Sequence, residues 1–237
     1  GLTLFFGTTT TQVANATMRR KPPYDPVKDF APVALAGTTA LVLMVHPSVP
    51  ANTVQEFIAY ARAHPGQLAF ASPYASSRMA GELFKQMAQV DMLNVPYKAT
   101  VAATTDLVGG QVQVMFGDLW SAMPHIQSGR VRALAVTTAQ RAAAAPQLPT
   151  LAESGLPGYE MVAWAGFFVP ARTPAAAVTR LNQELNVIIA SPEFRQRMRE
   201  SGSEPAPISP SAFGAMVVAE LDKWRRLVET ARVEVVD

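Results

Sequence analysis

The sequence predicts an α/β fold in which two lobes are joined by two crossing strands. Apolar strand segments alternate with amphipathic helices, and the links between them are short. This alternation is typical of α/β layers with parallel strands. Two apolar segments, Phe30–Val45 and Tyr159–Val169, exceed the usual strand length of about 5–6 residues. They bracket a self-contained block of roughly 125 residues, which we interpret as an inserted lobe.

We therefore expect an outer lobe made of residues 1–36 and 165–237, and an inner lobe made of residues 37–164. Gly37 interrupts the first long segment, which is either two strands or one ribbon that passes between the lobes. In hinged proteins of this type, ligands bind at the carboxyl ends of the strands. The loops that occupy this position follow Phe6, Phe70, Tyr97 and Phe116.

Individual elements are delimited by capping residues, prolines and glycines. Thr53 and Glu56 form a capping box at the start of one helix, and Thr150 and Glu153 form another. Three later helices each start with a capping residue followed by proline. The expected helices are 54–63, 79–90, 101–108, 122–127, 150–154, 174–189, 192–202 and 210–231, and the shorter strands are 2–6, 68–71, 94–98, 111–116 and 131–136.

Composition excludes several classes of protein. Hydrophobic residues make up 49% of the chain, which favours a compact globular fold over disorder. The net charge is only +2 and the basic residues are scattered, so we expect no nucleic-acid partner. The longest apolar run is too short and too broken to span a membrane. The chain has no cysteine, which excludes disulfide bonds and thiolate chemistry.

The segment Leu68–Phe84 is the strongest candidate for a binding site. An apolar strand ends at Ser72-Pro73, and Ser76, Ser77 and Arg78 precede the apolar positions of the next helix. Hydroxyls, free backbone N–H groups and a guanidinium at a helix N-terminus favour anion binding. The alternative is that the serines only cap the helix.

Other candidates are weaker. The hydroxyls of Thr8, Thr9 and Thr10 follow the first strand, where threonines also serve as β-formers or caps. Thr100 is a plausible cap for the helix 101–108. Asp118 can bind a ligand amine or cap the next helix, and the cap is the simpler role. Among the aromatic residues, Trp120 lies in a loop and is a candidate ligand wall, whereas Trp164 suits core packing.

The sequence shows no catalytic or metal-binding motif, neither G-x-S-x-G, H-E-x-x-H, a P-loop nor G-x-G-x-x-G. We therefore expect no cofactor and no enzymatic activity. The histidines His46, His64 and His125 lie far apart, and only His125 follows a candidate ligand loop. The competing hypothesis is an enzyme that uses Tyr97, Lys98, Asp118 or His125, which requires a convergent pair of titratable groups.

Several motifs resemble the Bug-type solute-binding receptors of tripartite tricarboxylate transporters. Pro23-Tyr-Asp-Pro-Val-Lys-Asp-Phe30 is similar to a signature of that family. The other matching motifs occur in family order along the whole chain: Ala80–Phe84, Val95–Lys98, Asp106–Val112, Arg132–Val136, Pro149–Gly158 and Phe168–Pro174.

The resemblance implies a two-lobed, type II periplasmic-binding-protein fold that closes on a small organic acid. It also implies a periplasmic location and delivery of the solute to the membrane components of the transporter. Carried over by position, the ligand contacts come from both lobes: Thr8, Thr9, Thr10, Ser72, Tyr74, Ser76, Ser77, Arg78, Thr100, Asp118, Trp120 and Trp164.

Three departures from the family pattern bear on this expectation. The chain starts inside an apolar strand and lacks the family's N-terminal portion, so it is either a fragment or has a differently built outer lobe. Arg78 occupies a position often held by His, which favours a direct salt bridge to a carboxylate. Ala99 and Gly117 stand where Gly and Asp are common. A degenerate relative that binds nothing is therefore a further alternative.

Overall fold

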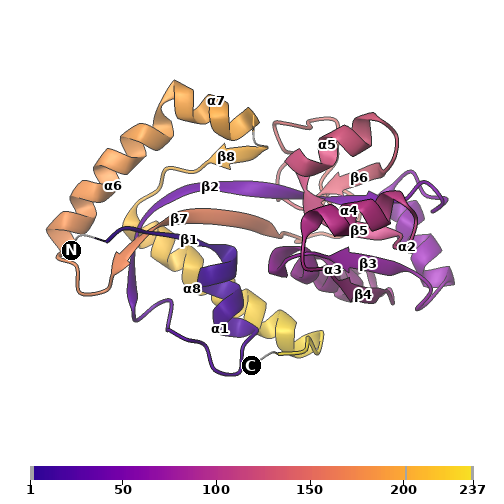
Figure 1. Ribbon diagram of the computed structural model, residues 1–237, viewed down its shortest axis with the longest axis horizontal. Helices are drawn as coiled ribbons and strands as arrows, with labels where there is room; N and C mark the ends of the chain where they lie inside the picture. Colours follow the sequence, from indigo (N-terminus) through magenta and orange to yellow (C-terminus); the bar gives the residue numbers. More distant parts are fainter. Residues whose placement is uncertain (1–2, 201, 236–237) are drawn as a thin grey trace. The chain divides into compact units, whose positions relative to one another are not determined.

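The computed structural model describes residues 3–200 and 202–235 (Figure 1). The chain divides into two compact units. Unit 1 contains the residues up to Thr39 and those from Ala163 onward, and unit 2 contains Ala40–Val162. The chain passes between the units inside strand β2 (Phe30–Val45) and at the start of strand β7 (Val162–Pro170).

Strand β2 is one ribbon of 16 residues, which decides between the two alternatives left by the sequence. Gly37 does not break it, because this residue pairs with Pro205 of the short strand β8 (Ser203–Pro205). A Cβ on Gly37 would lie 2.5 Å from the carbonyl oxygen of Glu204. The glycine therefore allows the close approach of β8.

Unit 1 is a sheet with the order β1-β7-β2-β8, where β1 (Phe5–Thr8) runs antiparallel to β7. Alternate residues of β7 face opposite sides. Trp164 and Phe168 pack on Phe213 of helix α8 (Pro210–Thr230), with ring centroids 5.5 and 4.9 Å from it. On the opposite side, Val169 packs in a buried cluster with Ile189 of α6 (Ala175–Ala190). Helix α7 (Pro192–Glu200) follows α6 in the chain.

Unit 2 is a sheet with the order β6-β2-β5-β3-β4, covered by helices on both faces. The strands are β3 (Ala69–Ser72), β4 (Leu93–Pro96), β5 (Val114–Asp118) and β6 (Arg132–Val136). The helices are α2 (Val54–Ala63), α3 (Ala75–Ala88), α4 (Thr100–Val108) and α5 (Leu119–Gln127).

Side-chain alternation places these helices. Phe84 of α3 packs between Phe57 of α2 and Phe116 of β5, at 5.6 and 5.7 Å between ring centroids. On the other face, Met115 of β5 belongs to a buried cluster with Leu107 of α4 and with residues of α5. The chain therefore has α2 and α3 on one face of the unit 2 sheet, and α4 and α5 on the other.

The expected parallel strands are present in unit 2, where β3 is parallel to its neighbours β4 and β5. The β1–β7 pair and the pairings of β2 with β5, β6 and β8 are antiparallel. Other expectations were wrong. The segment 150–154 is a turn rather than a helix. The sequence also missed β8, as well as the π-helix η1 (Thr10–Ala14) and the short helix α1 (Asn15–Thr17) that follow β1.

Candidate ligand-binding site

Three parallel strands of unit 2 end at the same edge of the sheet. Ser72, at the end of β3, is in register with Pro96 of β4, and Ala71 is in register with Met115 of β5. Asp118 ends β5 a little further along. We call this region the carboxyl edge and define it as residues 72–78, 97–100 and 117–121. It contains most of the predicted contacts.

Helices α3, α4 and α5 begin at the carboxyl edge, and none has a side-chain cap. Their N-cap residues are Tyr74, Ala99 and Asp118. In contrast, Thr53 caps α2 and Ser209 caps α8 with hydroxyl hydrogen bonds to backbone N–H groups. The uncapped helix ends leave N–H donors and positive dipole ends available to an anion.

The serines of the carboxyl edge between residues 72 and 78 are buried, and their hydroxyl groups form at most long hydrogen bonds. Ser77 is completely buried, and its hydroxyl lies 3.5 Å from the carbonyl oxygen of Ala71. The Ser72 hydroxyl has an equally long contact with the carbonyl oxygen of Val95. Both contacts are at the limit of a hydrogen bond. Ser76 lies in the first turn of α3 and is also buried. These hydroxyls are therefore weakly held.

Arg78 is a half-buried cation without a counterion. Its Nε atom is buried and has no hydrogen-bond partner, and no ion pair of Arg78 occurs within residues 3–200 and 202–235. A buried guanidinium N–H without an acceptor is costly. The arrangement can accept a carboxylate, which offers oxygens in the geometry that a guanidinium prefers.

Tyr74 and Asp118 bring two titratable groups together at the carboxyl edge. Burial raises the pKa of the Tyr74 phenol well above its usual range, and the charge of Asp118 raises this pKa further. Burial also raises the pKa of Asp118, an effect that the Tyr74 hydroxyl partly offsets. The Tyr74 hydroxyl nevertheless does not reach hydrogen-bond geometry and stays a buried, unpaired group. Asp118 occupies the N-cap position of α5, but its side chain forms no capping hydrogen bond, contrary to the simpler expectation.

Two further candidates lie on the helices that cover the other face. Thr100 is the first residue of α4 and does not cap it, because the N-cap position belongs to Ala99. Trp120 lies in α5 rather than in a loop, and 59% of its surface is exposed. Both residues are accessible at the carboxyl edge.

Unit 1 contains the remaining candidates. Thr9 is buried, and its hydroxyl accepts a hydrogen bond from the backbone N–H of Trp164 at 2.9 Å. This hydroxyl therefore ties the end of β1 to β7. Thr8 is half-buried, and its backbone N–H donates to the Thr11 hydroxyl. Thr10 is exposed, and Trp164 is a core residue, as its sequence context indicated.

The residues of the enzyme hypothesis do not form a pair with one another. The Tyr97 hydroxyl donates to Asp106 at 2.8 Å. Burial, and secondly this contact with Asp106, raises the pKa of Tyr97 to about 12. His46 contacts Ser48, and His64 stacks on Tyr60. Among the described residues, no group of acidic residues and histidines could hold a metal ion. None of the described helices is long and apolar enough to cross a membrane.

A family model described as "Tripartite tricarboxylate transporter family receptor" matches residues 1–233. The chain belongs to this receptor family, called TctC. The family assignment confirms the resemblance seen in the sequence and agrees with the expectation that the chain is not an enzyme.

Relatives of this chain are known in several bacteria. A UPF0065 protein encoded in the tcbD–tcbE intergenic region of Pseudomonas sp. strain P51 is 36% identical over 214 residues. BugT of Bordetella pertussis is 29% identical over 208 residues. These matches cover 89% and 87% of this chain, and 64% of the length of each relative. The chain thus spans less than two thirds of these two relatives.

Solved structures of family members share the fold. Rpa4515 of R. palustris with adipate has a TM-score of 0.86 and 35% identity, covering 98% of this chain and 78% of that one. MatC from Rhodopseudomonas palustris with bound malate has a TM-score of 0.79 and 30% identity, covering 95% and 78%. The periplasmic binding protein BugD has a TM-score of 0.81 and 29% identity, covering 98% and 78%. The predicted α/β binding-protein fold is therefore confirmed.

The sequence named Tyr74 and Asp118 separately but missed their proximity. Each lies three residues beyond Ala71 and Met115, the last parallel pair of β3 and β5, so their proximity follows from the register of these two strands. The sequence did not single out Arg130, which lines a pocket between α4 and α5. It follows Gly129 at the end of α5, and a glycine just after a helix is a recognisable Schellman signal.

Proposed function

We propose that this chain is the solute-binding part of an extracytoplasmic receptor that captures a small carboxylate-bearing solute. The observation that carries the proposal is the carboxyl edge of unit 2. There, three uncapped helix N-termini accompany Arg78, a half-buried cation without a counterion. Membership of the receptor family and the adipate and malate of the two solved neighbours support it.

The finer parts of the proposal come from the family. We place the receptor in the periplasm and expect it to deliver its solute to the membrane components of a tripartite tricarboxylate transporter. The lobes are proposed as residues 1–36 with 165–237, and 37–164. We propose Arg78, Ser76 and the free N–H groups of α3 as the first anchors of the carboxylate, with Thr10 as a contact from the outer lobe.

The decisive experiment is a thermal-shift and calorimetric screen of adipate, malate and citrate on the wild-type chain and on Arg78→Ala. We expect at least one acid to stabilise the wild type, and the Arg78→Ala variant to lose about tenfold or more in affinity, since a charge-assisted hydrogen bond contributes roughly 1.5–3 kcal/mol. Arg180→Ala is the matched control, because Arg180 is exposed on α6 of unit 1.

The outcomes separate the alternatives. Stabilisation that is lost in Arg78→Ala but kept in Arg180→Ala supports the receptor. Failure of every acid to stabilise the wild type would favour a degenerate relative that binds nothing. Consumption of the acid during the calorimetric run would instead indicate an enzyme.

A further inference from the structure

A pocket of about 300 Å³ lies between α4 and α5 in unit 2. Its volume is at the lower end of the range for small-molecule sites, about 300–1,000 Å³. The pocket shares Thr100 and Ser121 with the carboxyl edge and extends from there along both helices as far as Arg130. The Ser121 hydroxyl is already engaged, because it donates to the carbonyl of Asp118 at 3.1 Å. It therefore lies on the flank of α4 and α5, whereas Ser72, Tyr74 and Arg78 are not part of its lining.

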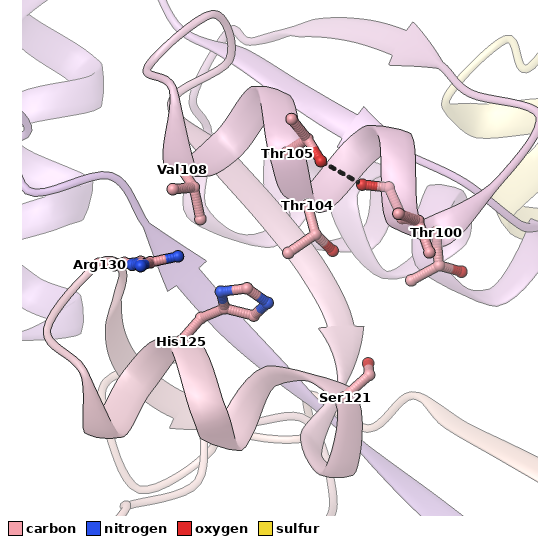
Figure 2. Close-up of a pocket in the computed structure, with 8 residues that line it drawn as sticks. Thr100, Thr104, Thr105, Val108, Ser121, His125 and Arg130 are labelled. Atoms are coloured by element: carbon pink, nitrogen blue, oxygen red, sulfur yellow. Dashed lines mark hydrogen bonds between the residues drawn. The ribbon is translucent and has the colours of Figure 1, made fainter.

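Two basic side chains meet at one end of this pocket. Figure 2 shows that His125 of α5 points into the space between the helices and that Arg130 extends toward the same space. A Schellman turn holds them together. The N–H of Arg130 donates to the carbonyl of His125 at 3.0 Å, and the N–H of Gly129 donates to the carbonyl of Ile126 at 3.0 Å. Gly129 has the positive φ of 69° that this turn requires.

Two hydroxyls complete the polar lining. Thr104 of α4 points across the gap toward α5, and Thr100 lies at the uncapped start of α4 (Figure 2). Within the described part of the chain, neither hydroxyl forms a hydrogen bond, and the side chains of His125 and Arg130 likewise have no partner. In contrast, the neighbouring Thr105 hydroxyl is already donated to the carbonyl of Val101 at 2.9 Å.

The lining thus combines basic groups and free hydroxyls with the side chains of Val101 and Val108, and no acidic residue contributes to it. Val101 is 79% exposed, so its apolar surface is accessible at the pocket. An anion with an apolar body matches both kinds of surface, because its charge can face the basic groups while its chain covers the valines.

We propose that the pocket between α4 and α5 is a second binding site, adjoining the carboxyl edge but without Arg78 in its lining, for a small monocarboxylate with a short aliphatic chain. The carboxylate is held by Arg130, His125 and the Thr104 hydroxyl, and the aliphatic chain lies against Val101 and Val108. This site lies wholly within unit 2 and does not depend on the ligand proposed for the receptor.

The test is a titration of the full chain with sodium butyrate, followed by NMR of the threonine and valine methyl groups. We expect saturable shifts at Thr104, Val101 and Val108. Arg130→Ala should weaken butyrate binding by about tenfold or more. Thr104→Val should weaken it by severalfold, whereas Thr105→Val should leave it unchanged, because the Thr105 hydroxyl is already engaged.

Two comparisons make the result decisive. 1-Butanol, which has the same chain without the charge, should not saturate the site, and equal binding of butanol would overturn the proposal of an anion site. Arg78→Ala should leave the shifts at Thr104 unchanged, so failure at the carboxyl edge and failure at this pocket are distinguishable. Shifts that stay linear with butyrate concentration, or that persist unaltered in Arg130→Ala, would also overturn it. Basic residues at the end of α5 would then serve only to stabilise the helix.

Discussion

At the scale of single residues, the carboxyl edge contains an acid whose environment disfavours its charge. Burial raises the pKa of Asp118, so this carboxyl binds its proton more tightly in the folded state than in the unfolded chain. A raised pKa in the folded state means that this contribution to stability is fully present below the pKa of the unfolded chain. It is lost as pH rises through the higher pKa of the folded state. At neutral pH, the ionised Asp118 therefore opposes folding.

Asp118→Asn should consequently stabilise the chain at pH 7, by roughly 0.5–1 kcal/mol in the free energy of unfolding. The gain should disappear below about pH 3.9, the ordinary pKa of an aspartate, since the wild-type carboxyl is then neutral as well. Urea unfolding at pH 3.5 and pH 7 measures both quantities. Asp91→Asn is the control, because Asp91 is exposed. A lower stability of Asp118→Asn at pH 7 would contradict the expected sign.

The two neighbouring threonines Thr9 and Thr10 show how far residue type alone determines a role. The sequence proposed both as ligand contacts because both follow the first strand. The Thr9 hydroxyl is engaged with the backbone of Trp164, whereas Thr10 is exposed and its hydroxyl forms no hydrogen bond within the described residues. The difference depends on β7, which lies 155 positions away in the chain. No local pattern contains that information.

At the scale of elements, the continuity of β2 depends on Gly37. A Cβ at this position would meet the carbonyl oxygen of Glu204 and the side chain of Met198. The backbone oxygen cannot move without disrupting the β2–β8 pairing. Gly37→Ala should therefore lower the free energy of unfolding by about 1–3 kcal/mol, the usual cost of overpacking.

The measurement for Gly37→Ala is urea unfolding beside Thr38→Ala, the adjacent position of the same strand. Thr38 is half-buried, so its truncation should cost less than about 1 kcal/mol. Equal stability of Gly37→Ala and the wild type would show that β8 can move away freely. In that case the close approach would not explain the glycine.

The capping boxes explain why some elements were predictable and one was not. At Thr53 and Glu56, the box is followed by Phe57 and Ala61, which are buried at helical spacing, and α2 forms. At α2 the Glu56 carboxylate accepts from the N–H of Asn52 instead of Thr53, whereas both reciprocal bonds of a capping box form at Thr150 and Glu153, at 2.9 and 3.0 Å. There, Ser154-Gly155 follows, and the chain makes only a turn. The box specifies the first turn, and the apolar residues that follow decide whether a helix forms.

At the scale of the whole molecule, the sequence predicted two units because its two longest apolar strands bracket one block. It could not predict which strands pair. The strands β3, β4 and β5 are parallel, and their register brings Ser72, Tyr74 and Asp118 to one edge. Loops that follow strands in sequence are thus identifiable from the sequence, whereas proximity within a site requires the sheet order.

The proposal that both units hold the acid leads to a prediction for the whole chain. Arg78 belongs to unit 2 and Thr10 to unit 1. If both contact the ligand, Arg78→Ala and Thr10→Ala should each weaken binding of the acid identified in the screen. At a fixed ligand concentration, each should reduce the ligand-dependent stabilisation, which is about 2.7 kcal/mol for the wild type at 100 times its Kd.

Thr9→Val is the matched control for Thr10→Ala. It removes the hydrogen bond to Trp164 and should lower the stability of the free chain by about 1–3 kcal/mol while leaving the affinity for the acid unchanged. Calorimetric titration measures the affinity, and urea unfolding without ligand measures the stability. A loss of affinity in Arg78→Ala alone, with Thr10→Ala equal to the wild type, would show that unit 2 binds the acid without the Thr10 side chain. A loss of affinity in Thr9→Val would show that ligand binding depends on the position of the end of β1, which the Thr9 hydrogen bond to β7 fixes.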